Sequence, residues 1–348
     1  MFNSLTISIG IFIVAAFVIA IVGIKMTKIA DRLADRTGLG EAVVGALFLG
    51  GSTSLPGIVT SVTTAAGGHA ELAISNALGG IAAQTAFLGL ADIVYPKANL
   101  EHAAASAANL SQGTLLITLL ALPLLAIATP QVTLWSIHPT SFVIPLAYVF
   151  SLRLISSARE TPMWSPRRTK ETYIDEGEAD EKDRSSLTGL WMRFGFYALT
   201  IGVAGYVVAQ SGVAIAKLAE GIAEQTGISE SVVGGLFTAV STSLPELVTS
   251  IAAVKQGALT LAVGDIIGGN SFDVLFIAFA DFAYRQGSIY HALTQSQSFI
   301  IALTILMTGI LLLGLLRREK HGIGNIGFES FLILVLYLGG FALLFFAF

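Results

Sequence analysis

The chain contains no cysteine in its 348 residues, which excludes disulfide bonds and thiolate metal ligands. Charged residues are scarce as well. Asp, Glu, Lys and Arg together make up 12% of the sequence, about half of the share that is usual in soluble domains. The net charge of −4 provides no basic surface for a nucleic acid. These absences exclude a soluble domain of ordinary composition and predict no nucleic-acid partner.

Apolar residues account for 54% of the chain, and the mean hydropathy is +0.78. The hydrocarbon core of a bilayer is about 30 Å thick and takes roughly 20 apolar residues per helix. The sequence contains ten apolar segments of this kind, which predict an all-α integral membrane protein with ten transmembrane helices. The predicted spans are 5–27, 41–65, 69–94, 111–129, 133–155, 190–211, 229–254, 258–284, 293–315 and 325–347.

One long polar segment, residues 156–189, separates two apolar blocks, and its mixed charges, Pro and Ser predict a mobile connecting loop. If the ten spans alternate in direction, most Lys and Arg residues lie on the same side of the membrane as this loop. Because positively charged loops tend to stay in the cytoplasm, we expect a cytoplasmic central loop and both termini outside. The first apolar segment has no basic residue before it, so we expect a retained span rather than a signal peptide.

The second half of the chain repeats the first at a constant offset of 189 residues, the difference between positions 241 and 52, and we call this difference the repeat offset. The stretch STSLPGIVTS at 52–61 matches STSLPELVTS at 241–250, and the similarity extends through the neighbouring apolar segments. We therefore predict two five-helix repeats, 1–155 and 190–348, joined by the loop 156–189. Because five is an odd number, the second repeat enters the membrane from the opposite side. Such inverted repeats are typical of transporters that bind their substrate between the two halves.

Each repeat carries a proline in the middle of a span, Pro56 or Pro245, directly after hydroxyl residues. Proline breaks a helix and frees carbonyl oxygens, and these together with hydroxyls suit hard cations. The following spans contain SNALGG at 75–80 and GDIIGGN at 264–270, whose glycines allow helices to approach closely or to bend. The second repeat also places three carboxylates in apolar surroundings, on Glu246, Asp265 and Asp273.

Charged side chains inside a membrane cost about 2.5–3.5 kcal/mol each, so these carboxylates are expected to face a wet cavity, a cation or one another. Their oxygen chemistry favours Ca²⁺ or Na⁺ over zinc or copper. Asp265 could equally cap a helix break, and Asp92 and Asp281, at the ends of their spans, are expected at the membrane interface. An intramembrane enzyme with Ser54 or Ser243 as nucleophile is disfavoured, because no His or Lys lies at a matching position to activate it.

The stretches STSLPELVTS and GDIIGGNSFD resemble the second repeat of the cation/Ca²⁺ antiporter superfamily, whose prokaryotic sodium/calcium exchangers have ten helices in two inverted halves. The resemblance covers nearly the whole chain apart from the central loop. In the second half it implies cation ligands at the Ala239 carbonyl, Thr242, Ser243, Glu246, Asn270 and Asp273, and the further candidate Asp265 stands where the family has an asparagine. In the first half it implies ligands at the Gly50 carbonyl, Thr53, Ser54 and Gln84. Gly57 stands where the family has a second glutamate, so the carboxylates are concentrated on the second repeat.

The expected function is a secondary active antiporter of the sodium/calcium exchanger type that moves Ca²⁺, or a related cation, against Na⁺ or H⁺ by alternating access. The resemblance implies no cofactor. The expected partners are inorganic cations and the lipid bilayer of a prokaryotic inner membrane, and the oligomeric state stays open. Because Gly57 removes one negative charge, we expect altered coupling, with Glu246 as a candidate proton carrier. The alternatives are a monovalent cation/proton exchanger and a transport-inactive sensor or scaffold.

Overall fold

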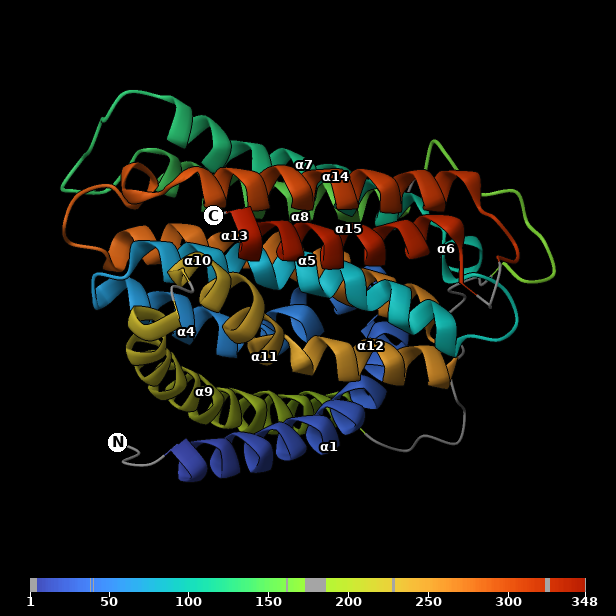
Figure 1. Ribbon diagram of the computed structural model, residues 1–348. Helices are drawn as coiled ribbons and strands as arrows, with labels where there is room; N and C mark the ends of the chain where they lie inside the picture. The colour runs from blue at the N-terminus through green and yellow to red at the C-terminus, as the bar shows by residue number, and fades with distance from the viewer. Residues whose placement is uncertain are drawn as a thin grey trace.

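The computed structural model describes residues 5–37, 39, 41–160, 162–172, 186–226, 229–322 and 326–347, and these residues form a bundle of helices (Figure 1). In the first half the long elements are α1 (Leu5–Thr37), α4 (Leu55–Ala66), α5 (Ala70–Val94), α7 (Ala107–Ala128) and α8 (Thr140–Glu160). In the second half they are α9 (Leu187–Thr226), α12 (Leu244–Gln256), α13 (Leu259–Ala283), α14 (Gln295–Arg317) and α15 (Phe328–Ala347). The short elements are α2 (Glu41–Val44), η1 (Gly45–Gly50), α3 (Gly51–Thr53), α6 (Leu100–Ala103), α10 (Glu230–Val232), η2 (Val233–Thr238), α11 (Ala239–Thr242) and η3 (Ile289–Ala292).

Seven helices in the described residues are long and apolar enough to cross a membrane, or nine if each of two bent pairs counts as one span. The bent pairs are Gly45–Thr53 with Leu55–Ala66 and Glu230–Thr242 with Leu244–Gln256. Each of these nine segments overlaps a different span predicted from the sequence, and the remaining predicted span, 5–27, lies in α1. The membrane character of the protein and its nearly all-helical fold are thus confirmed, while the number of ten spans stays a prediction.

Helices α5 and α13 form the centre of the bundle (Figure 1). In their most apolar stretches, 83% of the residues of α5 and 94% of the residues of α13 are buried, whereas half or fewer are buried in the outer spans. Helices α1 and α9 pack on each other in an outer layer and contact α12 and α4, the second arms of the bent pairs. Helices α7, α8, α14 and α15 cover the other side of α5 and α13. The bent pairs are therefore held between the outer layer and the two central helices.

Close backbone contacts at glycines fix the bent pairs against the central helices. A Cβ atom on Gly79 of α5 would lie 2.1 Å from the Gly235 carbonyl oxygen in η2, and a Cβ atom on Gly268 of α13 would lie 2.0 Å from Ala46 Cβ in η1. The two contacts are equivalent, because the repeat offset relates Gly79 to Gly268 and Ala46 to Gly235. Helices α5 and α13 run unbroken through their glycines, so the glycines permit close approach and do not break the helices.

A second pair of equivalent contacts lies at the ends of α5 and α13. Each carries a fully buried aspartate that accepts backbone N–H groups from two loops, one following its own helix and one in the other half of the chain. The pairs are Asp92 with Leu100 and Gly327, and Asp281 with Ile289 and His138. All four partners are also related by the repeat offset. Although both aspartates lie at span ends as expected, they are buried loop anchors and not exposed interfacial groups.

Some predicted boundaries differ from the observed helices. The span predicted at 133–155 becomes helical only at Thr140, because Trp135 and Ser136 have positive φ angles and Pro139 disfavours helical backbone in the residue before it. The central loop begins after α8, at residue 161, and residues 173–185 lie outside the described part. Its described part is docked: Arg318 donates hydrogen bonds to the Arg167 carbonyl and to Thr172.

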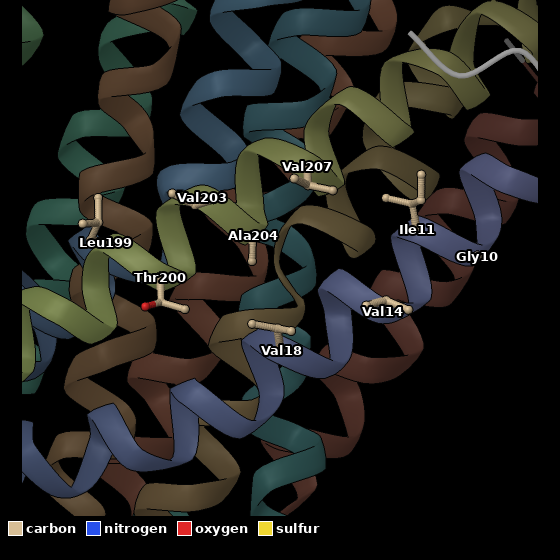
Figure 2. Close-up of a pocket in the computed structure, with 9 residues that line it drawn as sticks. All are labelled: Gly10, Ile11, Val14, Val18, Leu199, Thr200, Val203, Ala204 and Val207. Atoms are coloured by element: carbon tan, nitrogen blue, oxygen red, sulfur yellow. The ribbon is translucent and has the colours of Figure 1, made fainter.

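An open groove with a volume of about 570 Å³ lies between α1 and α9 (Figure 2). Its lining side chains are apolar except for Thr200, whose hydroxyl donates to the Phe196 carbonyl of its own helix. Val14 and Val203 on its two walls are 65% and 59% exposed. A groove of this kind offers no ligand to an ion, so the polar chemistry of the protein lies elsewhere.

We predict that Gly79→Ala lowers the stability of the protein by about 1–3 kcal/mol, because the added methyl group meets backbone that cannot move aside. Gly309→Ala in α14 is the matched control, since a Cβ atom there has no neighbour within 4 Å. Thermal unfolding of the purified protein in detergent measures both changes. Equal melting temperatures for the two variants would contradict the close packing of α5 on η2.

A second prediction concerns Glu101 in α6, a short helix outside the candidate spans. Burial, with the nearby negative charges of Asp92 and Glu329, raises the pKa of Glu101 from 4.5 to about 7, although its hydrogen bond from Ser330 acts in the opposite direction. The folded protein therefore keeps a proton that the unfolded chain releases, and stability falls as the pH rises from about 4.5 to about 7.

We expect Glu101→Gln to remove this loss, which corresponds to up to about 3 kcal/mol. Melting temperatures between pH 4.5 and pH 8 test the prediction: the variant should gain on the wild type as the pH increases. Glu171→Gln is the control, because a hydrogen bond from Lys320 lowers the pKa of this exposed carboxyl group. A constant difference between wild type and Glu101→Gln across the pH range would exclude the proposed titration.

Candidate cation-binding site

The two bent pairs break at equivalent serines, Ser54 and Ser243, each followed by a proline two residues later. The bends are 53° and 43°. Proline lacks the N–H group that would continue the helix, which explains why both helices break at this point. A serine before a new helix usually caps it with its hydroxyl group, but neither serine does so here. Both hydroxyls instead take part in hydrogen bonds between the two repeats.

A small enclosed cavity lies between the two breaks. It offers about 10 Å³ to the centre of a water-sized molecule, about the space for one water or one ion. The first repeat contributes Ser54, Gly57, Asn76, Ala77, Gly80 and Gln84, and the second contributes Thr242, Ser243, Glu246, Asp273 and Phe276. Six of these are ligand candidates from the sequence: Ser54, Gln84, Thr242, Ser243, Glu246 and Asp273.

Neutral donors of the first repeat hydrogen-bond to the carboxylates of the second across the cavity. Ser54 Oγ donates to Glu246 Oε1 at 3.2 Å, and Gln84 Nε2 donates to Asp273 Oδ2 at 2.6 Å. Gln84 Nε2 also lies 3.4 Å from Ser243 Oγ, which can accept from it. Gln84 and Asp273 are equivalent positions of the repeat. The amide group of Gln84 therefore lies opposite the carboxylate of Asp273, which occupies the equivalent position in the other half.

The cavity has more acceptors than donors. Both carboxylates are buried, with Glu246 0% and Asp273 1% exposed. Three buried oxygens that line the cavity have no hydrogen-bond partner within the protein: Gln84 Oε1, Glu246 Oε2 and Asp273 Oδ1. Asp265 Oδ1 and Asn270 Oδ1, close by on α13, are in the same condition. Buried acceptors without donors are costly, and a cation or a proton satisfies them.

Five candidate ligands from the sequence do not line this cavity: Gly50, Thr53, Ala239, Asp265 and Asn270. The Gly50 and Ala239 carbonyls are not free, because each accepts a backbone N–H from the serine four residues later. Asp265 Oδ2 accepts a 2.6 Å hydrogen bond from Thr249, and Asn270 Nδ2 donates to Thr85. The Thr53 hydroxyl donates to the Leu49 and Gly50 carbonyls of its own helix.

Asn76 and Phe276 line the cavity and were not predicted as site residues. Asn76 donates to the Gly57 carbonyl and to Ser61 Oγ, and its Oδ1 accepts from Thr242 at 3.4 Å. The signal was present, since the repeat pairs Asn76 with Asp265. Phe276 gave no such signal, because an aromatic residue in an apolar helix is usually part of the core.

The polar atoms that line the cavity are of the kind that could hold a cation. Among the residues that the structure describes, no three His, Asp or Glu side chains come together as a metal site. The cavity instead combines two carboxylates with neutral hydroxyl and amide oxygens, which are the ligand types of Ca²⁺ and Na⁺.

A sequence model of the sodium/calcium exchanger protein family matches residues 7–156 and 194–347 of the chain. The chain is 26% identical over 258 residues to Inner membrane protein YrbG of Escherichia coli (strain K12), covering 73% of this chain and 72% of that protein. It is 26% identical over 308 residues to Putative antiporter CaxA of Alkalimonas amylolytica, covering 87% and 89%. It is also 29% identical over 118 residues to Sodium/calcium exchanger MaX1 of Methanosarcina acetivorans, covering 33% and 34%.

The fold is similar to a solved structure of the sodium-calcium exchanger NCX_Mj soaked with 10 mM Na⁺ and zero Ca²⁺. The TM-score is 0.68, the sequence identity is 19%, and the match covers 97% of this chain and 99% of that one. At this identity the likeness establishes the fold alone.

Proposed function

The chain belongs to the sodium/calcium exchanger protein family, and we propose that it is a secondary active antiporter that moves Ca²⁺, or a related cation, against Na⁺ or H⁺. Membership of a family of membrane antiporters agrees with the resemblance read from the sequence. The proposed cation site consists of the two carboxylates Glu246 and Asp273 with the neutral oxygens of Ser54, Gln84, Thr242 and Ser243. The cation is the cargo of the protein.

The observation that carries this proposal is the surplus of buried acceptors at the break of the two bent pairs. Glu246 Oε2, Asp273 Oδ1 and Gln84 Oε1 line one cavity and have no donor within the protein. A structural network would supply donors to such oxygens, because a buried polar group without a partner destabilises the fold. A binding site leaves them for the ligand.

The proposed architecture consists of ten helices in two inverted five-helix repeats, 1–155 and 190–348, with a cytoplasmic connection and both termini outside. Support comes from the contacts that exchange partners under the repeat offset, at Gly79 and Gly268 and at Asp92 and Asp281. In such an arrangement each repeat can adopt the conformation of the other, which exposes a central site to the two sides in turn.

We predict that Glu246→Gln abolishes stabilisation by cations and ion exchange. Losing a buried charged ligand costs about 3 kcal/mol or more, which corresponds to roughly a 100-fold weaker apparent affinity. Thermal stabilisation by Ca²⁺, Na⁺ and K⁺, varied one at a time at fixed pH, measures binding in the purified protein. Uptake of ⁴⁵Ca²⁺ into proteoliposomes against a Na⁺ or a pH gradient measures exchange.

Glu230→Gln is the matched control, because it makes the same chemical change at a partly exposed carboxylate that contacts His69 outside the cavity. Cation stabilisation that survives Glu246→Gln unchanged would falsify the proposed site. Stabilisation by Na⁺ and by pH but not by Ca²⁺ would favour the monovalent cation/proton exchanger. Binding without flux would favour the sensor.

A further prediction separates the two aspartates of α13. Asp273 lines the cavity, whereas Asp265 lies outside it and is held by Thr249. We therefore expect Asp273→Asn to lose cation stabilisation as Glu246→Gln does, and Asp265→Asn to change the apparent affinity by less than about tenfold, or about 1.4 kcal/mol. Titration of the melting temperature with Ca²⁺ compares the two variants. An equal loss in both would place Asp265 among the ligands.

A further inference from the structure

Gly57 and Phe276 both line the cavity, and the Phe276 ring lies directly against Gly57. A Cβ atom on Gly57 would lie 2.6 Å from Phe276 Cε2 and 3.4 Å from the neighbouring ring atoms Cδ2 and Cζ. Atoms of two side chains do not approach to 2.6 Å, so no larger residue fits at 57 while the ring stays in place. In the second repeat the equivalent of Gly57 is Glu246. The ring therefore fills the space in which a carboxylate of the first repeat would begin.

The ring of Phe276 is held in this position by its neighbours. Phe272, one turn earlier on α13, contacts Phe276 edge to face with ring centroids 6.2 Å apart, and Tyr148 of α8 contacts Phe272 in the same way at 5.8 Å. A Cβ atom on Gly51 would lie 3.8 Å from the Phe272 ring, which is ordinary van der Waals contact. Two glycines of the first bent pair thus face two phenylalanines of α13.

The other half of the chain has a different combination at the equivalent positions. Gly51 and Gly57 correspond to Val240 and Glu246, and Phe272 corresponds to Ala83, whereas Phe276 corresponds to Phe87, another phenylalanine. The exchange of volume between the first bent pair and the helix that it faces is thus confined to Phe272, because residues 87 and 276 are both phenylalanine. Because interiors pack at nearly constant density, Phe272 compensates in volume for a missing side chain of the bent pair, but it does not compensate in charge.

The first repeat contributes no charged side chain to the cavity. Every polar residue that the first repeat contributes to the lining is neutral, namely Ser54, Asn76 and Gln84, and both carboxylates come from the second repeat. Two carboxylates balance one divalent cation, and the remaining space suits one ion.

We propose that Phe276 is a specificity-determining residue, which closes the first-repeat side of the cavity so that the site binds one cation beside Glu246 and Asp273 and has no place for a second. This inference rests on the proposed function, because it assumes that Glu246 and Asp273 bind cations. It adds that the ring, and not only the absence of a carboxylate at Gly57, limits the number of ions.

The test counts bound cations in the purified full-length chain by equilibrium dialysis with ⁴⁵Ca²⁺ and ²²Na⁺. Wild type should bind one Ca²⁺ per chain. Gly57→Glu alone should lower the melting temperature, because the new side chain meets the ring. The double variant Gly57→Glu/Phe276→Ala should regain stability relative to Gly57→Glu and bind two or more Na⁺ per chain, with steeper Na⁺ dependence of thermal stabilisation. Gly57→Gln/Phe276→Ala, equal in size but neutral, should fold and gain no ion.

The possible failures are distinguishable. A wild type that binds no cation, or binding that persists in Glu246→Gln, overturns the proposed function itself. A wild type that binds two or more cations at the Glu246 site overturns the inference even if no double variant folds. A folded Gly57→Glu/Phe276→Ala protein with the same ion count as its Gln counterpart also overturns the inference and leaves the proposed function intact.

Discussion

The close crossing of each bent pair over a central helix is the constraint on which the rest of the structure depends. Gly79 touches the backbone of η2 and Gly268 touches Ala46 of η1, so the two breaks are pressed against α5 and α13. This approach brings Ser54 and Ser243, with their unused capping hydroxyls, to the carboxylates and amide on the facing elements. A side chain at either glycine would separate the helices and open the cavity, because backbone atoms on the opposite side cannot yield.

The two repeats contribute different chemical groups to the cavity. The first repeat supplies hydroxyl and amide groups, and the second supplies both negative charges. Gln84 and Ser54 each satisfy one oxygen of a carboxylate and leave the other without a donor. An amide and a hydroxyl hold a carboxylate in a fixed orientation without neutralising it. The remaining charge is therefore available to a cation, and in a low-dielectric interior its attraction is strong.

The sequence predicted much of this arrangement because its signals are local or repeated. Pro56 and Pro245 predicted both breaks, and the duplicated stretch with acidic residues in apolar surroundings predicted that Glu246 and Asp273 would meet. The direction in which other residues face could not be predicted. Wider π-helical turns, η1 and η2, precede both breaks and each adds a residue to the turn, which rotates the following side chains away from the regular helical period.

Asp265 illustrates a further limit, because a carboxylate in an apolar helix predicts a polar environment but not which neighbour provides it. Here the neighbour is the Thr249 hydroxyl group on the adjacent helix. Phe276 illustrates the opposite case, in which an ordinary core residue acquires importance only through the glycine that it faces. Pairwise complementarity of this kind depends on the helix crossing, which no single segment encodes.

The positions at which the repeats agree and those at which they differ follow from two separate demands. Backbone contacts such as those of Asp92 and Asp281 are matched in both halves, even to the exchange of their partners. An antiporter of the proposed kind needs this match, because each half has to adopt the conformation of the other with little difference in free energy. The charge of the site carries no such demand. Both repeats line the same cavity, so a cation experiences only their sum, and one half can hold all the carboxylates while the other holds the donors that orient them.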